Sequence, residues 1–266
     1  MRDRLARLTL VAVAVAVVVV AGLAACSDDP DGAAGSGTDR PPRATVTVFA
    51  AASLTEAFTA LGDAFEAAEP GVSVELSFGP SSELATQIAE GAPADVLASA
   101  DERTMAAAVD AGSIEGEPTV FATNGMEIAV PAGNPGGVDG LDDFADADLV
   151  IGLCAQDVPC GRLARQVLGS AGVEPSIDTD EADVKALLAK IASGDLDAGL
   201  VYRTDVRAAD DDVDGITLPE EHQVVTRYPI APVATAAQPD LAEDFVAFVA
   251  SPDGRAILER FGFGPP

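Results

Sequence analysis

The sequence has 266 residues, 48% of them hydrophobic and 22% charged, so it can supply the core of one large or two ordinary domains. Its 44 acidic residues outnumber its 15 basic residues and give a formal net charge of −29. This balance argues against a nucleic-acid partner, because the phosphate backbone would be repelled instead of exchanging its counterions for Lys and Arg. We interpret the acidic residues as a solvated surface and not as an acidic binding patch.

Residues 1–25 are interpreted as a signal peptide. Arg2, Arg4 and Arg7 form a basic segment before an uncharged apolar stretch that ends at Cys26. A single membrane-spanning anchor is the alternative, because this stretch is long for a signal peptide. Loss of residues 1–25 would remove three arginines and one aspartate and take the net charge to −31.

The end of this stretch, Leu23-Ala24-Ala25-Cys26, resembles the lipobox of bacterial lipoproteins, whose cysteine is lipidated and becomes the mature N-terminus. Under either interpretation, most of the chain lies outside the cytoplasm and is tethered to the cell membrane. Residues 26–43 are rich in Asp, Gly, Ser and Pro without apolar periodicity, so they are predicted to form a lipidated, flexible spacer. The folded part is expected to begin near residue 44.

Two cysteines remain, Cys154 and Cys160 in "GLCAQDVPCGR". In an oxidising compartment such a pair is a disulfide candidate. A metal site is the alternative, but two thiols without a nearby histidine or third thiol are a weak signal for one.

Along the chain, apolar runs of strand length alternate with helical patterns, which predicts an α/β fold with parallel-rich sheets flanked by helices. In such folds, ligands bind beyond the carboxyl ends of the strands. The predicted strands are 44–50, 72–78, 95–99, 149–153 and 198–202, and the predicted helices are 54–68, 82–90, 101–111, 161–171 and 181–193.

Two extended, proline-containing segments, 125–135 and 226–235, interrupt this alternation. If they cross between two lobes, residues 44–124 and 232–266 form the first lobe and residues 125–231 form the second. The C-terminal residues 239–263 are predicted to form two amphipathic helices that complete the first lobe.

Ser53 lies where the first strand meets the first helix and precedes Glu56 by three residues, which is the pattern of a capping box. Its simplest interpretation is therefore a helix cap. However, small or neutral residues also begin the helices near residues 81, 101, 159 and 183. Several helix N-termini that point at one place bind an anion through free N–H groups, so we predict an anion site there.

The strings "TVFAAASLTEAF", "SSELATQIAEGAPADVLASAD", "VPCGRLARQVL", "ADVKALLAKI" and "LDAGLVYRTD" resemble the periplasmic molybdate-binding proteins of ABC-type importers, the ModA family. The resemblance covers nearly the whole chain after the leader. It implies a two-lobe periplasmic-binding-protein fold of type II that holds a tetrahedral oxyanion between its lobes with neutral donors.

The resemblance also implies which residues hold molybdenum as molybdate. Serine hydroxyls with their N–H groups, three further backbone N–H groups and one phenol would bind the ion, with Ser82 as an alternate for the second serine. These residues are, in that order, Ser53, Ser81, Ala100, Cys160, Val184 and Tyr202.

Two residues depart from the family pattern. Cys160 replaces a frequent alanine, so a disulfide to Cys154 would lie in the binding loop, and Pro80 replaces a frequent serine and removes an N–H group. The alternative interpretation of Ser81 is a helix cap, and that of Tyr202 is a partly buried aromatic residue in a strand. Nearby Arg162 and Arg203 would either offset the acidic field or be ordinary surface arginines.

A serine hydrolase is the main rival from another class, but the single histidine, His222, lies in an acidic turn and no G-x-S-x-G motif is present. A metal-binding receptor lacks a histidine cluster or calcium-loop spacing. We therefore expect a non-enzymatic, monomeric lipoprotein without a cofactor that delivers molybdate or tungstate to an ABC permease with its cytoplasmic ATPase. Another tetrahedral oxyanion such as sulfate is the alternative ligand.

Overall fold

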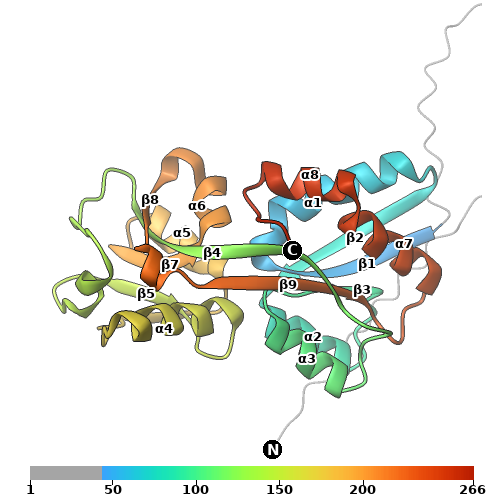
Figure 1. Ribbon diagram of the computed structural model, residues 1–266, viewed down its shortest axis with the longest axis horizontal. Coiled ribbons are helices and arrows are strands. Elements are labelled where there is room, and N and C mark those ends of the chain that lie inside the picture. The colour runs from blue at the N-terminus through green and yellow to red at the C-terminus, as the bar shows by residue number, and fades with distance from the viewer. Residues whose placement is uncertain (1–43) are drawn as a thin grey trace, which may run out of the picture. The chain divides into compact units, whose positions relative to one another are not determined.

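The computed structural model describes residues 44–266, so the predicted signal peptide, the lipidation site at Cys26 and the spacer lie outside the described residues. Strands and helices alternate along this part of the chain (Figure 1). The strands are β1 (Ala44–Ala51), β2 (Val72–Gly79), β3 (Val96–Ala98), β4 (Thr119–Pro131), β5 (Ile151–Cys154), β6 (Thr179–Glu181), β7 (Ala198–Tyr202), β8 (Val213–Thr217) and β9 (Val225–Pro232). The α-helices are α1 (Thr55–Ala68), α2 (Ser81–Ala89), α3 (Glu102–Asp110), α4 (Pro159–Ala171), α5 (Val184–Ala192), α6 (Arg203–Ala209), α7 (Pro239–Ala250) and α8 (Pro252–Arg260). The short 3₁₀ helices are η1 (Ala52–Leu54), η2 (Leu141–Ala145), η3 (Asp210–Asp212) and η4 (Glu220–His222).

All nine described strands belong to one mixed sheet in the order β2-β1-β3-β9-β4-β7-β5-β6, with β8 paired to β4. β1 is parallel to β2 and β3, and β5 is parallel to β6 and β7, whereas β4 and β9 are antiparallel to their neighbours. Both halves of the sheet therefore place the carboxyl ends of their parallel strands next to helix N-termini, as the alternation in the sequence predicts.

Two long strands connect the halves of the sheet. β4 pairs with β9 up to Gly125 and with β7 from Met126 onward, so it belongs to both halves. Figure 1 shows α1–α3, α7 and α8 grouped around β1–β3, and α4–α6 grouped around β5, β7 and β8. We call these groups lobe 1 and lobe 2. The predicted boundaries of the lobes, at 124/125 and 231/232, stay a prediction.

The helices and strands predicted from periodicity are present within a few residues of their predicted ends, including the two C-terminal helices. The prediction is wrong for the start of the helix over 181–193. Residues 179–181 instead form the edge strand β6, and α5 begins after Asp183, whose carboxylate accepts the Ala186 N–H at 2.9 Å. α6 and β8 were not predicted.

Aromatic side chains join α7, the first of the two C-terminal helices, to the rest of lobe 1. Phe58 of α1 packs edge-on against Phe121 of β4 and Phe245 of α7, with ring centroids 5.6 and 6.3 Å apart. All three are buried, so truncation of Phe58 to alanine is expected to lower the free energy of unfolding by about 3–5 kcal/mol.

Among residues 44–266, no helix is both long and apolar enough to cross a membrane.

Candidate oxyanion site

A small cavity of about 20 Å³ lies between the lobes, and all six residues predicted to hold the oxyanion line it. The residues from lobe 1 are at the ends of β1 and β2, at the starts of η1 and α2, and in the connection from β3 to α3. Those from lobe 2 are at the starts of α4 and α5 and at the end of β7. The lining comprises Ala51, Ala52, Ser53, Gly79, Pro80, Ser81, Ala100, Val158, Pro159, Cys160, Asp183, Val184 and Tyr202.

This lining contains neither lysine nor arginine, and Asp183 is its one charged residue. The backbone can supply positive charge there instead, because α2, α4 and α5 each begin at the cavity and the first turn of a helix has N–H groups without partners inside the helix. An arrangement of neutral donors is suited to a small anion.

Ser53 does not cap its helix through its side chain, so the capping-box interpretation is wrong. Its hydroxyl lies 2.9 Å from the hydroxyl of Tyr228, on β9. Glu56, the other member of the expected box, bonds Lys185 Nζ at 2.9 Å instead. Tertiary partners thus replace the local cap, and Ser53, which is only 3% exposed, is held at the cavity wall.

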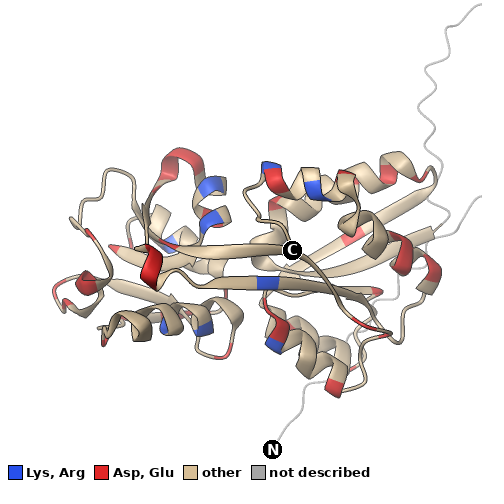
Figure 2. Ribbon diagram, in the orientation of Figure 1, with Lys and Arg blue, Asp and Glu red and all other residues tan. Residues whose placement is uncertain are grey.

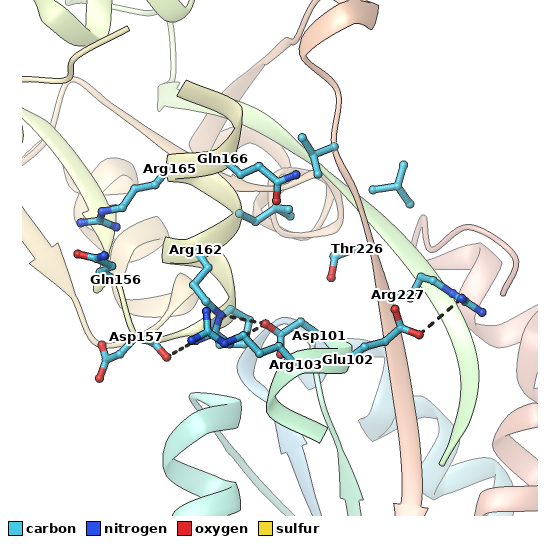
Figure 3. Close-up of a pocket in the computed structure, with 14 residues that line it drawn as sticks. Asp101, Glu102, Arg103, Gln156, Asp157, Arg162, Arg165, Gln166, Thr226 and Arg227 are labelled. Carbon is cyan, nitrogen blue, oxygen red and sulfur yellow. Dashed lines mark hydrogen bonds and ion pairs between the residues drawn. The ribbon is translucent and has the colours of Figure 1, made fainter. Parts of the chain in front are cut away.

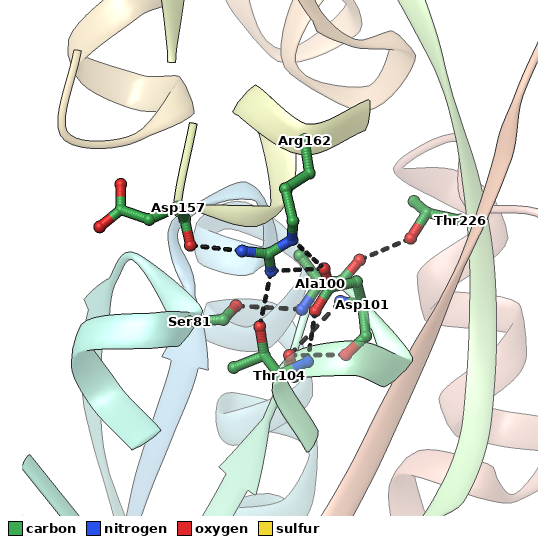
Figure 4. Close-up of polar contacts among 8 residues, drawn as sticks. Ser81, Ala100, Asp101, Thr104, Asp157, Arg162 and Thr226 are labelled. Atoms are coloured by element: carbon green, nitrogen blue, oxygen red, sulfur yellow. Dashed lines mark hydrogen bonds and ion pairs between the residues drawn. The ribbon is translucent and has the colours of Figure 1, made fainter. Parts of the chain in front are cut away.

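Ser81 is also not a side-chain cap of α2, because the residue at the N-cap position is Pro80. Its Oγ accepts the backbone N–H of Ala100 at 3.1 Å, while the Ala100 carbonyl accepts the Thr226 hydroxyl at 2.8 Å (Figure 4). The Ala100 N–H predicted to bind the oxyanion is therefore occupied by Ser81 in this structure. Since Ser81 Oγ accepts in this bond, its own proton remains available to a ligand.

Tyr202 lies at the end of β7 with 1% of its surface exposed, so the half-buried interpretation is wrong. Its hydroxyl has no hydrogen-bond partner among the described residues although it lines the cavity. Burial raises the pKa of this phenol well above its ordinary value, helped by neighbouring Tyr228 and Asp101. The phenol therefore stays protonated and can only act as a neutral donor or acceptor.

Cys160 and Cys154 form a disulfide, with their Cα atoms 5.8 Å apart, between β5 and the start of α4. The next residue, Gly161, packs against this loop so closely that a Cβ atom there would lie 1.9 Å from the Ala155 carbonyl oxygen. Only glycine fits this position. The disulfide and the glycine together fix the loop that presents the Cys160 N–H at the cavity.

Two sets of ion pairs join the lobes near the cavity. Arg162 of α4 bonds the carboxylate of Asp101 at 2.6 Å and the hydroxyl of Thr104 at 2.8 Å (Figure 4). Asp101 also caps α3, because its Oδ1 accepts the Thr104 N–H. Arg162 is therefore not a free surface arginine but a link between α4 and α3.

In the second set, Lys185 of α5 bonds Glu56 of α1 and lies 3.2 Å from the buried carboxylate of Asp205 in α6. Burial lowers the pKa of Lys185, but the two carboxylates outweigh it and the net shift is upward. Burial raises the pKa of Asp205 to about 6 despite the opposing effect of Lys185. The carboxylate of Asp205 is thus less favourable in the folded protein than in water.

Outside this cavity lies an open one of about 1020 Å³, and four arginines are among the residues that line it: Arg103, Arg162, Arg165 and Arg227 (Figure 3). Three of them are paired with carboxylates, at 2.6, 2.6 and 3.5 Å. Along the ribbon of the described residues, acidic positions are more frequent than basic ones (Figure 2). Arg203 faces neither cavity and lies instead beside Gly125 and Glu127.

The histidine considered for a hydrolase, His222, is not among the residues that line the cavity. Its Nδ1 is 3.2 Å from Ser170 Oγ, whose proton is donated to the Val167 carbonyl at 2.7 Å. His222 must then donate to Ser170, which is opposite to what a general base requires. Within residues 44–266, no three His, Cys, Asp or Glu side chains are placed to hold a metal ion.

Four residues behind the cavity were not singled out from the sequence. They are Asn124, Thr204, Asp205 and Tyr228, all buried. Each is a polar residue inside an otherwise apolar strand or at a helix start, which is the one local signal that could have identified them. Their contacts join segments up to 175 residues apart, so no local pattern predicts them.

Comparison with known proteins identifies relatives over nearly the whole chain. Residues 46–264 match the model of a family described as bacterial extracellular solute-binding protein. The molybdate-binding protein ModA of Mycobacterium tuberculosis H37Rv is 41% identical over 93% of this chain and 94% of its own length. ModA of Escherichia coli K12 is 32% identical over 82% of this chain and 88% of its own. The structure of the Azotobacter vinelandii periplasmic molybdate-binding protein superposes with a TM-score of 0.73 at 23% identity, over 83% of this chain and 99% of that chain.

Proposed function

Because this chain belongs to the family of the ModA molybdate-binding proteins, within the bacterial extracellular solute-binding proteins, we propose that it captures molybdate between its lobes and delivers it to an ABC transporter. It is a binding protein and not an enzyme. The observation that carries the proposal is the unpartnered, buried hydroxyl of Tyr202 in a cavity lined by helix N-termini and without a cationic side chain.

The donors that line the cavity suit a fully deprotonated, tetrahedral dianion. Ser53, Ser81 and Tyr202 each present a hydroxyl, and the starts of α4 and α5 present the N–H groups of Cys160 and Val184. Hydrogen bonds from such donors to a charged oxygen are stronger than neutral ones, at about 1.5–3 kcal/mol each. A few of them offset the loss of hydration of the ion without a positive side chain.

Binding requires the lobes to separate slightly before they close. A cavity of about 20 Å³ holds roughly one water-sized sphere, which is less than a tetrahedral oxyanion occupies. Entry of the ion would release the Ala100 N–H from Ser81 and free both groups for the ligand. The closed form is then favoured by contacts that the ion makes with both lobes at once.

We also propose that lipid on Cys26 anchors the protein to the outer face of the cell membrane, with residues 27–43 as the tether that lets it reach its permease. The support is the lipobox-like Leu23-Ala24-Ala25-Cys26. A Cys26→Ser variant should be released from the membrane fraction of cells that retain the wild type. Equal retention of both proteins would refute lipid anchoring at this cysteine.

The test of the ligand is calorimetric titration of residues 27–266 with molybdate, tungstate, sulfate and phosphate in turn. We expect one-to-one binding of molybdate and tungstate and no comparable binding of sulfate or phosphate. Sulfate shares the charge and shape of molybdate and differs in size, so a preference for sulfate would reassign the ligand and keep the transport role. Binding of none of the four would refute the proposal.

A further inference from the structure

A buried chain of polar side chains runs behind the cavity, from Asn124 through Tyr228 to Ser53. The Asn124 amide donates from Nδ2 to the Thr204 hydroxyl at 2.8 Å and to the Tyr228 hydroxyl at 3.4 Å. The Tyr228 hydroxyl lies 2.9 Å from Ser53 Oγ. All four residues are buried, with at most 5% of their surface exposed.

The orientation of the Asn124 amide is fixed by its own neighbour. The backbone N–H of Gly125 points at Asn124 Oδ1 at 3.0 Å. A flipped amide would place two donors face to face there, so the oxygen must lie on this side and Nδ2 must face Tyr228 and Thr204. Asn124 is therefore an obligate donor toward Tyr228.

Because Asn124 donates to Tyr228, the hydrogen bond between Tyr228 and Ser53 also has a fixed direction. The Tyr228 oxygen accepts from Asn124. Tyr202 packs beside Tyr228, but its hydroxyl has no hydrogen-bond partner among residues 44–266, so Ser53 Oγ is the acceptor within reach and takes the single phenol proton. Burial raises the pKa of Tyr228 above its ordinary value, so the proton stays on the phenol. Ser53 then accepts from behind, and its own O–H is left to point into the cavity.

We propose that Asn124 and Tyr228 are positioning residues that fix Ser53 as a hydrogen-bond donor to the bound oxyanion. The inference rests on the proposed function and extends it to residues that do not touch the ligand. Before an ion enters, Ser81 is oriented in the same sense, because its oxygen accepts the Ala100 N–H. Both serines thus face the cavity as donors, which favours an oxyanion without protons.

The hydrogen-bonded side chains from Asn124 to Ser53 also lie at the connection between the two lobes. Asn124 lies where β4 passes from lobe 1 to lobe 2, Tyr228 lies on β9, and Thr204 is in α6. The polarity of Ser53 is therefore set by groups on the two strands that connect the lobes and not by its own helix. A change on these strands can alter ligand selectivity without altering the cavity lining.

The test uses two variants: one replaces the Asn124 donor by an acceptor, and the other removes the Tyr228 hydroxyl that links Asn124 to Ser53. Asn124→Asp keeps the shape and the bond from Gly125 but replaces the donating NH₂ group by an acceptor. The Tyr228 proton would turn toward the new carboxylate, and Ser53 would donate to Tyr228 and face the ion with a lone pair. Tyr228→Phe removes the connecting hydroxyl, so Ser53 is no longer affected by what stands at position 124.

We expect Asn124→Asp to weaken molybdate binding roughly 10- to 100-fold and Tyr228→Phe to weaken it less than about fivefold, as measured by calorimetry on residues 27–266. In the Tyr228→Phe background, Asn124→Asp should weaken molybdate binding further by less than about threefold. The added carboxylate is present in both backgrounds, so its charge alone predicts equal losses. Equal losses in both backgrounds would overturn the inference.

A second measurement keeps the inference testable if the buried carboxylate of Asn124→Asp prevents folding. In Tyr228→Phe alone, Ser53 is free to accept as well as donate, so binding of hydrogen phosphate, which carries a proton, should improve relative to molybdate by roughly fivefold or more. The matched control is Phe121→Leu, which loosens packing against the Tyr228 ring and leaves its hydroxyl in place. A selectivity that is unchanged in Tyr228→Phe, or changed equally in the control, would overturn the inference. Failure of the wild type to bind molybdate would instead refute the proposed function.

Discussion

Replacement of Tyr202 by phenylalanine is expected to have opposite effects on stability and on binding. Among the described residues the buried Tyr202 hydroxyl has no hydrogen-bond partner, so its removal breaks no bond within the protein, and a buried hydroxyl without any partner destabilises a fold by about 1–3 kcal/mol. Its removal should raise the free energy of unfolding by about 1 kcal/mol. For a chain of this size, that corresponds to a melting temperature about 2–4 °C higher.

The same hydroxyl is expected to donate to a charged oxygen of the bound ion. A bond of that kind contributes about 1.5–3 kcal/mol, so molybdate affinity should fall roughly 10- to 100-fold in Tyr202→Phe. Calorimetric titration gives the affinity, and thermal or urea unfolding without ligand gives the stability. A variant that is less stable than the wild type would refute the unpartnered state of the hydroxyl, and unchanged affinity would refute its role in binding.

Three further predictions concern charge, the disulfide and the link between the lobes. In the folded wild type, Asp205 keeps its proton up to a pKa of about 6, so the wild type loses stability as the pH rises from 3.8 through that value. Between about pH 4 and pH 8, Asp205→Asn should therefore gain about 2–3 kcal/mol in free energy of unfolding relative to the wild type. A difference between the two proteins that is independent of pH would contradict this. Reduction of the bond between Cys154 and Cys160, which are six positions apart, should lower the free energy of unfolding by about 2 kcal/mol, and two free thiols before reduction would show that the bond does not form. Arg162→Ala should open the free protein and raise its radius of gyration in X-ray scattering, whereas an unchanged radius would show that the pair with Asp101 does not hold the lobes together.

The parts of the fold that depend on local patterns could be predicted from the sequence. Alternation and helical periodicity give most strands and helices, because burial of one face imposes them. The edge strand β6 escaped prediction because its residues, Thr179–Glu181, are all polar and so give no apolar alternation. The acidic run before Asp183 instead favours a helix start, which is where the prediction placed it.

The cavity could be predicted as a group of helix starts, but the partners of its side chains could not. Ser53 and Glu56 form a good capping-box pattern, yet each finds a distant partner, in Tyr228 and Lys185. A motif of four residues shows only which hydrogen bonds its own residues could make with one another. It carries no information about a partner such as Tyr228, which is 175 residues away from Ser53 in the sequence. The same limit hid Asn124, whose importance lies in the direction of its hydrogen bonds.

The structure also explains how a strongly acidic protein can hold a dianion. Its arginines near the cavity are mostly neutralised by carboxylates, so they provide little net attraction and serve to join the lobes. Attraction then comes from neutral donors at the cavity wall, above all the Tyr202 hydroxyl, which has no partner among the described residues, and the N–H groups at the starts of α4 and α5. The Tyr202 hydroxyl, left without a partner, destabilises the protein that holds no ion and is satisfied when the ion bridges the lobes, so the ion itself favours closure. This is why the gain in stability and the loss of affinity in Tyr202→Phe must occur together: both measure the same unsatisfied hydroxyl.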